Sequence, residues 1–220
     1  MVELKYKNWN EISINTFEKL QGLFNLEKTG DEQMDNLNMN ISMLSILCDV
    51  DEDTITDLPV NDFTELSKQC MFINEMPKAK IKDKYEINGQ MYEVQFNVED
   101  MTMNQYIDFQ TFIKEKEKYL KNICACFLIP KGKKYGDGYK ISEVVEDIGN
   151  SFSIVDAHSI FFFFTLLFQS LTKATLACLV KKMKREKKKM NKEQQVQVQR
   201  AIDEVNKVMN LVKSGAGLFG

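Results

Sequence analysis

The sequence predicts a mainly α-helical protein with a small β-hairpin (α+β), organised as a helical bundle with a long C-terminal helix. Apolar residues recur at helical spacing through most of the 220 residues, and only 3 prolines and 10 glycines interrupt them. The pattern changes to alternation at about 81–97, where Asn88-Gly89 separates two short runs and indicates a hairpin. Because 44% of residues are hydrophobic and 28% charged, the chain can bury a core.

Three helices are predicted before the hairpin. The first covers 9–24, with Asn10 or Ser13 as its N-cap. The second covers 31–48 and directs its apolar side chains, Met34 and Leu37 among them, towards the core. The third follows Pro59 and is capped by Asn61-Asp62.

After the hairpin, helix returns at Thr102 as N-cap and continues past 119–120. The lysine- and glycine-rich segment 130–140 is a loop, in which Tyr135 and Tyr139 are available to stack. A short helix at 141–148, capped by Ser142, precedes a long apolar helix that starts at Ser153 or Asp156.

The apolar run 160–180 has the length of a membrane span and is followed by basic residues. Lys173 in its second half is costly within a bilayer, and Thr165, Gln169 and Thr172 share one helix face. We therefore expect a core helix and no stable membrane insertion. A subunit interface and a transient membrane contact are the alternatives.

Charge is distributed unevenly along the chain. Residues 1–63 hold 13 acidic and 4 basic residues, a net charge of −9, and residues 181–220 hold 4 acidic and 11 basic residues, a net charge of +7. Such a chain is suited to stacking head to tail with its own copies or to docking two unlike partners. We therefore predict a domain at 1–180 and a C-terminal segment at 181–220, comprising a basic helix, a short heptad region and a tail.

Two sets of C-terminal residues are candidate contact sites. Apolar residues from Val198 onward are spaced by four and three, which is typical of a helix that packs against another helix. The candidate interface comprises Val198, Ile202, Val205, Met209, Val212, Leu218 and Phe219. The candidate contact for a polyanion or an acidic partner comprises Lys181, Lys182, Lys184, Arg185, Lys187, Lys188 and Lys189. A solvated helix face is the alternative for this second set.

Little in the sequence indicates catalysis. The chain has five cysteines without a CxxC pair and a single histidine, His158, which we expect in the core or at an interface. The acidic run 49–53 lacks the glycine and the last glutamate of a calcium loop. We therefore expect a protein that is not an enzyme and that needs no metal or cofactor.

Four segments together resemble a known group of proteins: 9–13 (WNEIS), 57–63 (DLPVNDF), 87–92 (INGQMY) and 101–109 (MTMNQYIDF). The succession resembles small proteins encoded among the tail and virion genes of bacteriophages, including baseplate-hub or tail assembly chaperones and their counterparts in crAss-like phages. The resemblance covers about residues 9–180. It implies a role in phage morphogenesis, in the host cytoplasm during assembly or in the virion tail or neck.

The first functional hypothesis is a virion structural protein that forms an oligomeric ring or connector at the portal–tail neck or in the tail. Its partners would be copies of itself and other virion proteins such as the portal, with nucleic-acid contact left open and not sequence-specific. The second hypothesis is a tail or baseplate assembly chaperone that is absent from the mature particle and offers Phe161–Phe164 and segment 34–43 to apolar clients. The third is cargo ejected with the genome.

Overall fold

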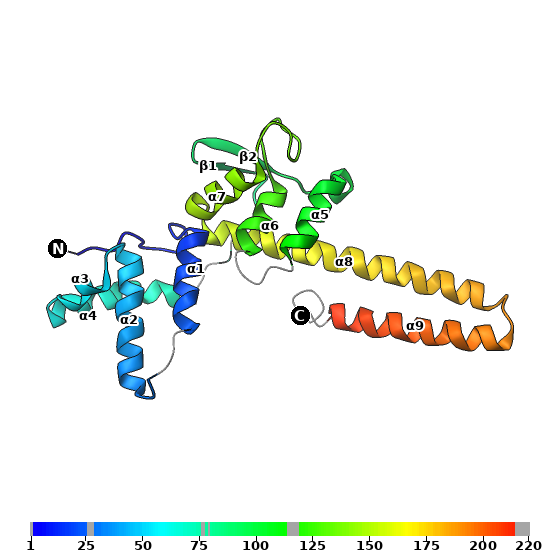
Figure 1. Cartoon of the computed structure of the whole chain (residues 1–220), viewed down its shortest axis with the longest axis horizontal. Helices are drawn as coiled ribbons and strands as arrows, with labels where there is room; N and C mark the ends of the chain where they lie inside the picture. The colour runs from blue at the N-terminus through cyan, green and yellow to red at the C-terminus, as the bar shows by residue number, and fades with distance from the viewer. Residues whose placement is uncertain (1, 26–28, 76–77, 79, 114–118, 214–220) are drawn as a thin grey trace. The chain divides into compact units, whose positions relative to one another are not determined.

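The computed structural model describes residues 2–25, 29–75, 78, 80–113 and 119–213, which divide into two compact units, Met1–Ile160 and Phe161–Gly220. The fold is mainly helical with a small antiparallel sheet, which confirms the predicted class (Figure 1). The division falls after Ile160, whereas the predicted boundary followed the change of charge at 180; that boundary stays a prediction.

The first unit contains α1 (Ile14–Gly22), α2 (Glu32–Cys48), α3 (Glu52–Thr56), α4 (Val60–Gln69), β1 (Lys84–Ile87), β2 (Gln90–Val94), α5 (Met103–Phe112), α6 (Tyr119–Phe127), β3 (Leu128–Pro130) and α7 (Ile141–Ser151). Short 3-10 helices occupy Leu23–Asn25, Cys70–Asn74 and Val98–Asp100. The helix α8 (Ile154–Lys187) begins in the first unit and continues through the second, which also holds α9 (Lys192–Lys213).

Side-chain caps fix the start of several helices. Ser13 accepts a hydrogen bond from the backbone N–H of Thr16 (3.2 Å) at the start of α1, as predicted. Thr102 and Gln105 form a reciprocal capping box at the start of α5. Ser153 accepts from the N–H of Val155 (3.2 Å) at the start of α8, which also agrees with the prediction.

Two predicted caps are wrong. Helix α4 begins before Asn61-Asp62, because the carbonyl of Pro59 already accepts from the N–H groups of Asp62 (2.9 Å) and Phe63 (3.0 Å). Similarly, Lys140 rather than Ser142 occupies the N-cap position of α7, and its carbonyl accepts from the N–H of Val144 (3.3 Å). In both cases the N-cap lies two or three residues before the polar side chain that was predicted.

The predicted hairpin is present and is completed by a third strand. Asn88 and Gly89 both have positive φ (51° and 74°), as a tight two-residue hairpin turn requires. In the order β1-β2-β3, Tyr85 lies opposite Tyr92, and Val94 lies opposite Leu128. The hairpin is therefore part of a three-stranded sheet formed within the chain.

The core of the first unit lies around α6, which packs against α5 and α7. Ile123, Cys124 and Phe127 of α6 are buried. The Phe127 ring packs edge to face with Phe109 of α5, with 5.4 Å between the ring centroids. The predicted single helix past 119–120 is wrong, because α5 ends at Phe112 and α6 begins at Tyr119.

Helix α2 buries only its second half. Leu44 and Leu47 are fully buried, whereas Met34 and Leu37 are 49% and 44% exposed. The prediction that these two residues face the core is therefore wrong. The first half of α2 presents apolar side chains to solvent in the isolated chain.

The apolar part of α8 also exposes large apolar side chains. Of its side chains described between 161 and 180, Phe164 and Val180 are buried, whereas Phe162 and Leu166 are 59% and 61% exposed. The prediction of a core helix over 160–180 is thus wrong for the single chain. Within the described residues α8 is long and apolar enough to cross a membrane, with 31% of its most apolar window buried; by length and composition alone this is weak evidence for a span.

Candidate functional site

The second unit is a helical hairpin in which α9 runs back along α8 (Figure 1). At its tip, Lys187 Nζ donates to Gln199 Oε1 (2.7 Å) across the hairpin. Asn191 caps α9 by accepting from the N–H of Gln194 (3.0 Å), and Gln195 Nε2 donates to the carbonyl of Met190 (2.8 Å). The heptad residues of α9 therefore have a helical neighbour within the chain.

The predicted interface residues are described only in part. Ile202 is 1% exposed, and Val198 and Val205 on the same face are half-buried. Met209 and Val212 lie in α9, but their side chains are outside the described set, as are Leu218 and Phe219 entirely. On α8, Val180 is buried, and Leu176 and Met183 at heptad steps from it are half-buried. We call Leu176, Val180 and Met183 the apolar seam; the sequence spacing could have revealed it, although only the α9 side was predicted.

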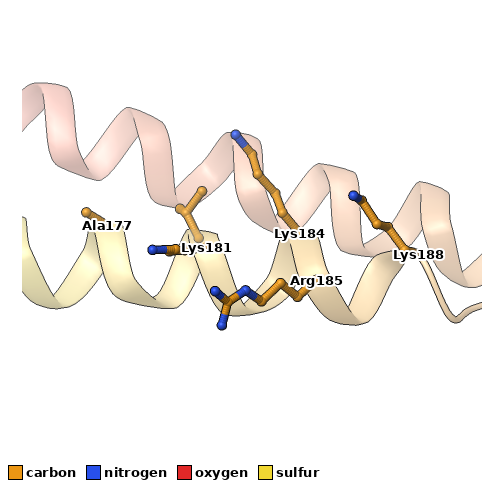
Figure 2. Close-up of a pocket in the computed structure, with 6 residues that line it drawn as sticks. Ala177, Lys181, Lys184, Arg185 and Lys188 are labelled. Atoms are coloured by element: carbon orange, nitrogen blue, oxygen red, sulfur yellow. The ribbon is translucent and has the colours of Figure 1, made fainter.

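Four predicted basic residues form one face of α8, which we call the basic stripe: Lys181, Lys184, Arg185 and Lys188. Their spacing of three and four residues places them within about 100° of one another around the helix. Together with Ala177 and Val180 they line a shallow hollow of about 340 Å³ (Figure 2). All four side chains are exposed, so the hollow is open to a partner.

The remaining predicted cations surround the tip. Lys182 and Lys189 are exposed, whereas Lys187 is half-buried. A second hollow of about 450 Å³ brings Lys187 together with residues of α9 that sequence reasoning missed: Lys192, Gln195, Val196, Gln199 and Arg200. Only the fold of the hairpin puts the start of α9 beside the end of α8, which is why these cations were not grouped.

The charge of the basic stripe is not neutralised within the described part of the chain, where no carboxylate lies within ion-pair distance of residues 181–189. Glu186 is the single acidic residue in that segment. The positive electrostatic field of these side chains attracts anionic groups within a Debye length of about 8 Å at physiological salt. Any binding to it should weaken steeply as salt is added.

A separate polar hollow of about 530 Å³ lies in the first unit beside the 131–140 loop. Lys133, Lys134 and Tyr135 of the loop line it together with Gln105 of α5. The hydroxyl of Tyr135 donates to Asp108 (2.9 Å), and its side chain is half-buried. The hydrogen bond to Asp108 orients the Tyr135 side chain, and burial, the nearby Cys126 and the Asp108 carboxylate raise the pKa of its hydroxyl.

Burial shifts the pKa values of several cysteines and of the single histidine. Burial raises the pKa of Cys70 to about 11 and that of Cys126 to about 12, and it also raises the pKa of Cys124. These thiols are therefore protonated at neutral pH, where a thiolate would be needed for attack. Burial lowers the pKa of His158, so its ring is neutral.

Acidic residues are used in local structure. Asp49 pairs with Lys5 (2.6 Å), and Asp51 caps α3 by accepting from the N–H of Thr54 (2.8 Å). Among the described residues no group of three or more His, Cys, Asp or Glu side chains is arranged to hold a metal ion.

Comparisons with protein-family models, with curated proteins and with solved structures find no match to this chain. The proposals below therefore rest on the residues described above and on the resemblance seen in the sequence.

Proposed function

We propose that the protein is a non-enzymatic assembly chaperone of a bacteriophage tail or baseplate, which holds apolar parts of unassembled components in the host cytoplasm. The observation that carries this proposal is the exposure of large apolar side chains on helices of both units. Met34 and Leu37 on α2 and Phe162 and Leu166 on α8 are each 44% or more exposed.

Met34 and Leu37 are about one turn apart on α2, as are Phe162 and Leu166 on α8, so each pair is a small apolar surface of the kind that binds partners. Methionine and phenylalanine suit a surface that meets more than one apolar client, because methionine adapts its shape and phenylalanine offers a large contact area. The protonated thiols of Cys70 and Cys126 are poor nucleophiles, which agrees with a role in binding.

The test is co-expression with each tail and baseplate protein of the phage, followed by affinity purification and by mass spectrometry of mature particles. We expect the protein to co-purify with an unassembled tail component and to be absent from finished virions. Recovery from mature particles at a fixed copy number would contradict the chaperone proposal.

The second candidate is the structural ring or connector subunit, located in the virion tail or neck. The observation that favours it is charge complementarity between copies: Asp57 and Asp62 are exposed within the acidic N-terminal region, and the basic stripe is exposed on α8. Acidic and basic surfaces on one chain can form a heterologous contact that closes into a ring. The same mass spectrometry decides between the candidates, because a ring subunit remains in the particle.

A third candidate, cargo ejected with the genome, is favoured by the apolar length of α8 and the basic residues that follow it. Liposome flotation tests it: an ejected membrane-active protein should float with vesicles, and a chaperone should remain in the soluble fraction.

A further inference from the structure

The tip of the α8–α9 hairpin carries positive charge that the chain itself leaves unpaired. Residues 181–200 contain nine basic and two acidic residues. Within the described part of the chain, none of the four side chains of the basic stripe pairs with a carboxylate or donates a hydrogen bond, and all four are exposed. Because like charges held close together repel one another, an anionic partner stabilises this arrangement.

The stripe is a row of charges that follows the axis of α8. Lys181 and Lys188 are seven residues apart, which separates their Cα atoms by about 10 Å along the helix axis. Lys184 and Arg185 lie between them on the same face, and Figure 2 shows the four charged ends set apart from one another. Along one strand of double-stranded DNA the phosphates repeat about every 3.4 Å. The row therefore has the length of about three phosphate spacings.

Contact with α9 leaves the basic stripe accessible. The apolar seam occupies a different part of the surface of α8, where Val180 is buried. Lys187 is used within the hairpin, since its Nζ donates to Gln199 Oε1 (2.7 Å). Lys182 and Lys189, in contrast, are exposed and lie beside the stripe around the helix, so they widen the positive surface.

We propose that the basic stripe binds the phosphate backbone of double-stranded DNA without reading its sequence. The proposal goes beyond the chaperone function and does not rest on it, because it uses charged residues that the chaperone proposal does not involve. Contacts to phosphates hold a protein on the duplex, whereas contacts to base edges read the sequence. A row of lysine side chains on a helix surface supplies contacts of the first kind.

The composition of the stripe argues against an acidic protein as its partner. Of the seven basic residues between 181 and 189, Arg185 is the single arginine. Protein–protein interfaces are enriched in arginine and aromatic residues and depleted in lysine. Arginine binds carboxylates through two parallel hydrogen bonds, whereas lysine acts as a point charge, which is also how it binds phosphate. A lysine-dominated surface therefore favours a polymer of phosphates.

The absence of aromatic residues argues against a membrane and against single-stranded nucleic acid. The sequence has no phenylalanine, tryptophan or tyrosine between Phe168 and Phe219. Such residues anchor basic helices at a membrane surface and stack on the bases of single strands. The backbone of a duplex needs cations alone, and its charges lie closer together than those of a single strand. Double-stranded DNA is therefore the partner that this surface fits.

The test measures the fluorescence anisotropy of labelled DNA duplexes of about two helical turns, in two unrelated sequences, as the full-length protein is added at several salt concentrations. The stripe variant carries Lys181→Gln, Lys184→Gln, Arg185→Gln and Lys188→Gln. The matched control replaces four exposed lysines of the first unit: Lys78→Gln, Lys80→Gln, Lys131→Gln and Lys134→Gln. Both variants change the net charge equally, so the comparison separates a local site from the overall charge.

We expect the wild type and the control to bind both sequences equally, with dissociation constants of about 1–100 μM at physiological salt. The stripe variant should bind at least about tenfold more weakly. The logarithm of the association constant falls with the logarithm of the salt concentration, and this slope should become shallower by about 3–4 when four phosphate contacts are removed. Because all four side chains are exposed, the variant should fold, which circular dichroism verifies.

The proposal is wrong if the wild type does not bind the duplex, if the control loses as much affinity as the stripe variant, or if one sequence is strongly preferred. It is also wrong if single-stranded DNA or duplex RNA of the same length binds more tightly. Tighter binding of phosphatidylserine vesicles or of poly-glutamate, lost in the stripe variant, would assign the stripe to a membrane or to an acidic protein. The stripe variant keeps the exposed apolar residues of α2 and α8, so its co-purification with tail components tests the chaperone function separately.

Discussion

Gln105 is the most informative residue for testing how the first unit is held together. Its side chain is fully buried, and its Nε2 group donates to the carbonyl of Cys126 (2.6 Å) and to Gln95 Oε1 (2.8 Å). The Cys126 carbonyl cannot find the usual helical donor four residues on, because that residue is Pro130, which has no N–H. Gln105 therefore satisfies a buried acceptor at the junction of α6 and β3.

Replacing Gln105 with methionine keeps the volume but removes both donated hydrogen bonds. Leaving the buried carbonyl unsatisfied costs about 1–3 kcal/mol, and the bond from the Thr102 N–H to Gln105 Oε1 is long at 3.4 Å and adds little. We therefore expect a loss of about 2 kcal/mol in the free energy of unfolding. For a unit of this size the thermal midpoint should fall by about 4–8 °C.

The assay is urea unfolding followed by the fluorescence of Trp9, the single tryptophan, which is buried in the first unit. Gln110→Met is the matched control, because Gln110 lies half-buried on the same helix. Its effect should stay within about 0.5 kcal/mol. If both variants shift the midpoint equally, the contact with Cys126 does not stabilise the junction and the reasoning fails.

Three further predictions concern the turn, the thiols and the histidine. Gly89→Ala should destabilise the fold by about 1–2 kcal/mol because φ is +74° there, whereas Gly22→Ala, helical and with open space around it, should not; thermal unfolding separates the two. Iodoacetamide at pH 8 should label Cys178 first, because it is exposed while the other four cysteines are buried and protonated; peptide mass spectrometry reports the order, and early labelling of Cys126 would contradict it. Because burial holds the pKa of His158 below its ordinary 6.5, the unfolded chain binds the proton more readily, so stability should fall as the pH drops from 6.5 to 5; His158→Phe should remove this part of the loss.

The fold class was predictable because local signals agreed with the final structure. Ser13, Asp31 and Thr102 cap the helices that follow them, and Asn88-Gly89 forms the turn of the hairpin. Each signal acts within a few residues, so tertiary contacts do not override it. The wrong caps at Asn61-Asp62 and Ser142 lie one or two residues inside the helix, within the usual error of a helix boundary.

Strand β3 was not predicted because its three residues directly follow helix α6 and are all buried. A fully buried strand has no polar alternation, so its period does not distinguish it from a buried helix. Pairing with Tyr92 and Val94 of β2 decides its conformation, and that is a contact between residues far apart in the sequence.

The prediction that the apolar residues of α2 and α8 are buried was wrong for a related reason. Periodicity shows that Met34 and Leu37, or Phe162 and Leu166, share a helix face, but it does not show what lies against that face. A heptad repeat on one helix predicts a neighbouring helix; the extent of that neighbour follows only from where the second helix ends. On α8 the apolar heptad positions Met183, Val180 and Leu176 are buried or half-buried, whereas Lys173 and Gln169 interrupt the repeat before the exposed Leu166 and Phe162. Periodicity therefore identifies the face of the helix, and only the extent of the neighbouring helix decides which residues on that face are buried.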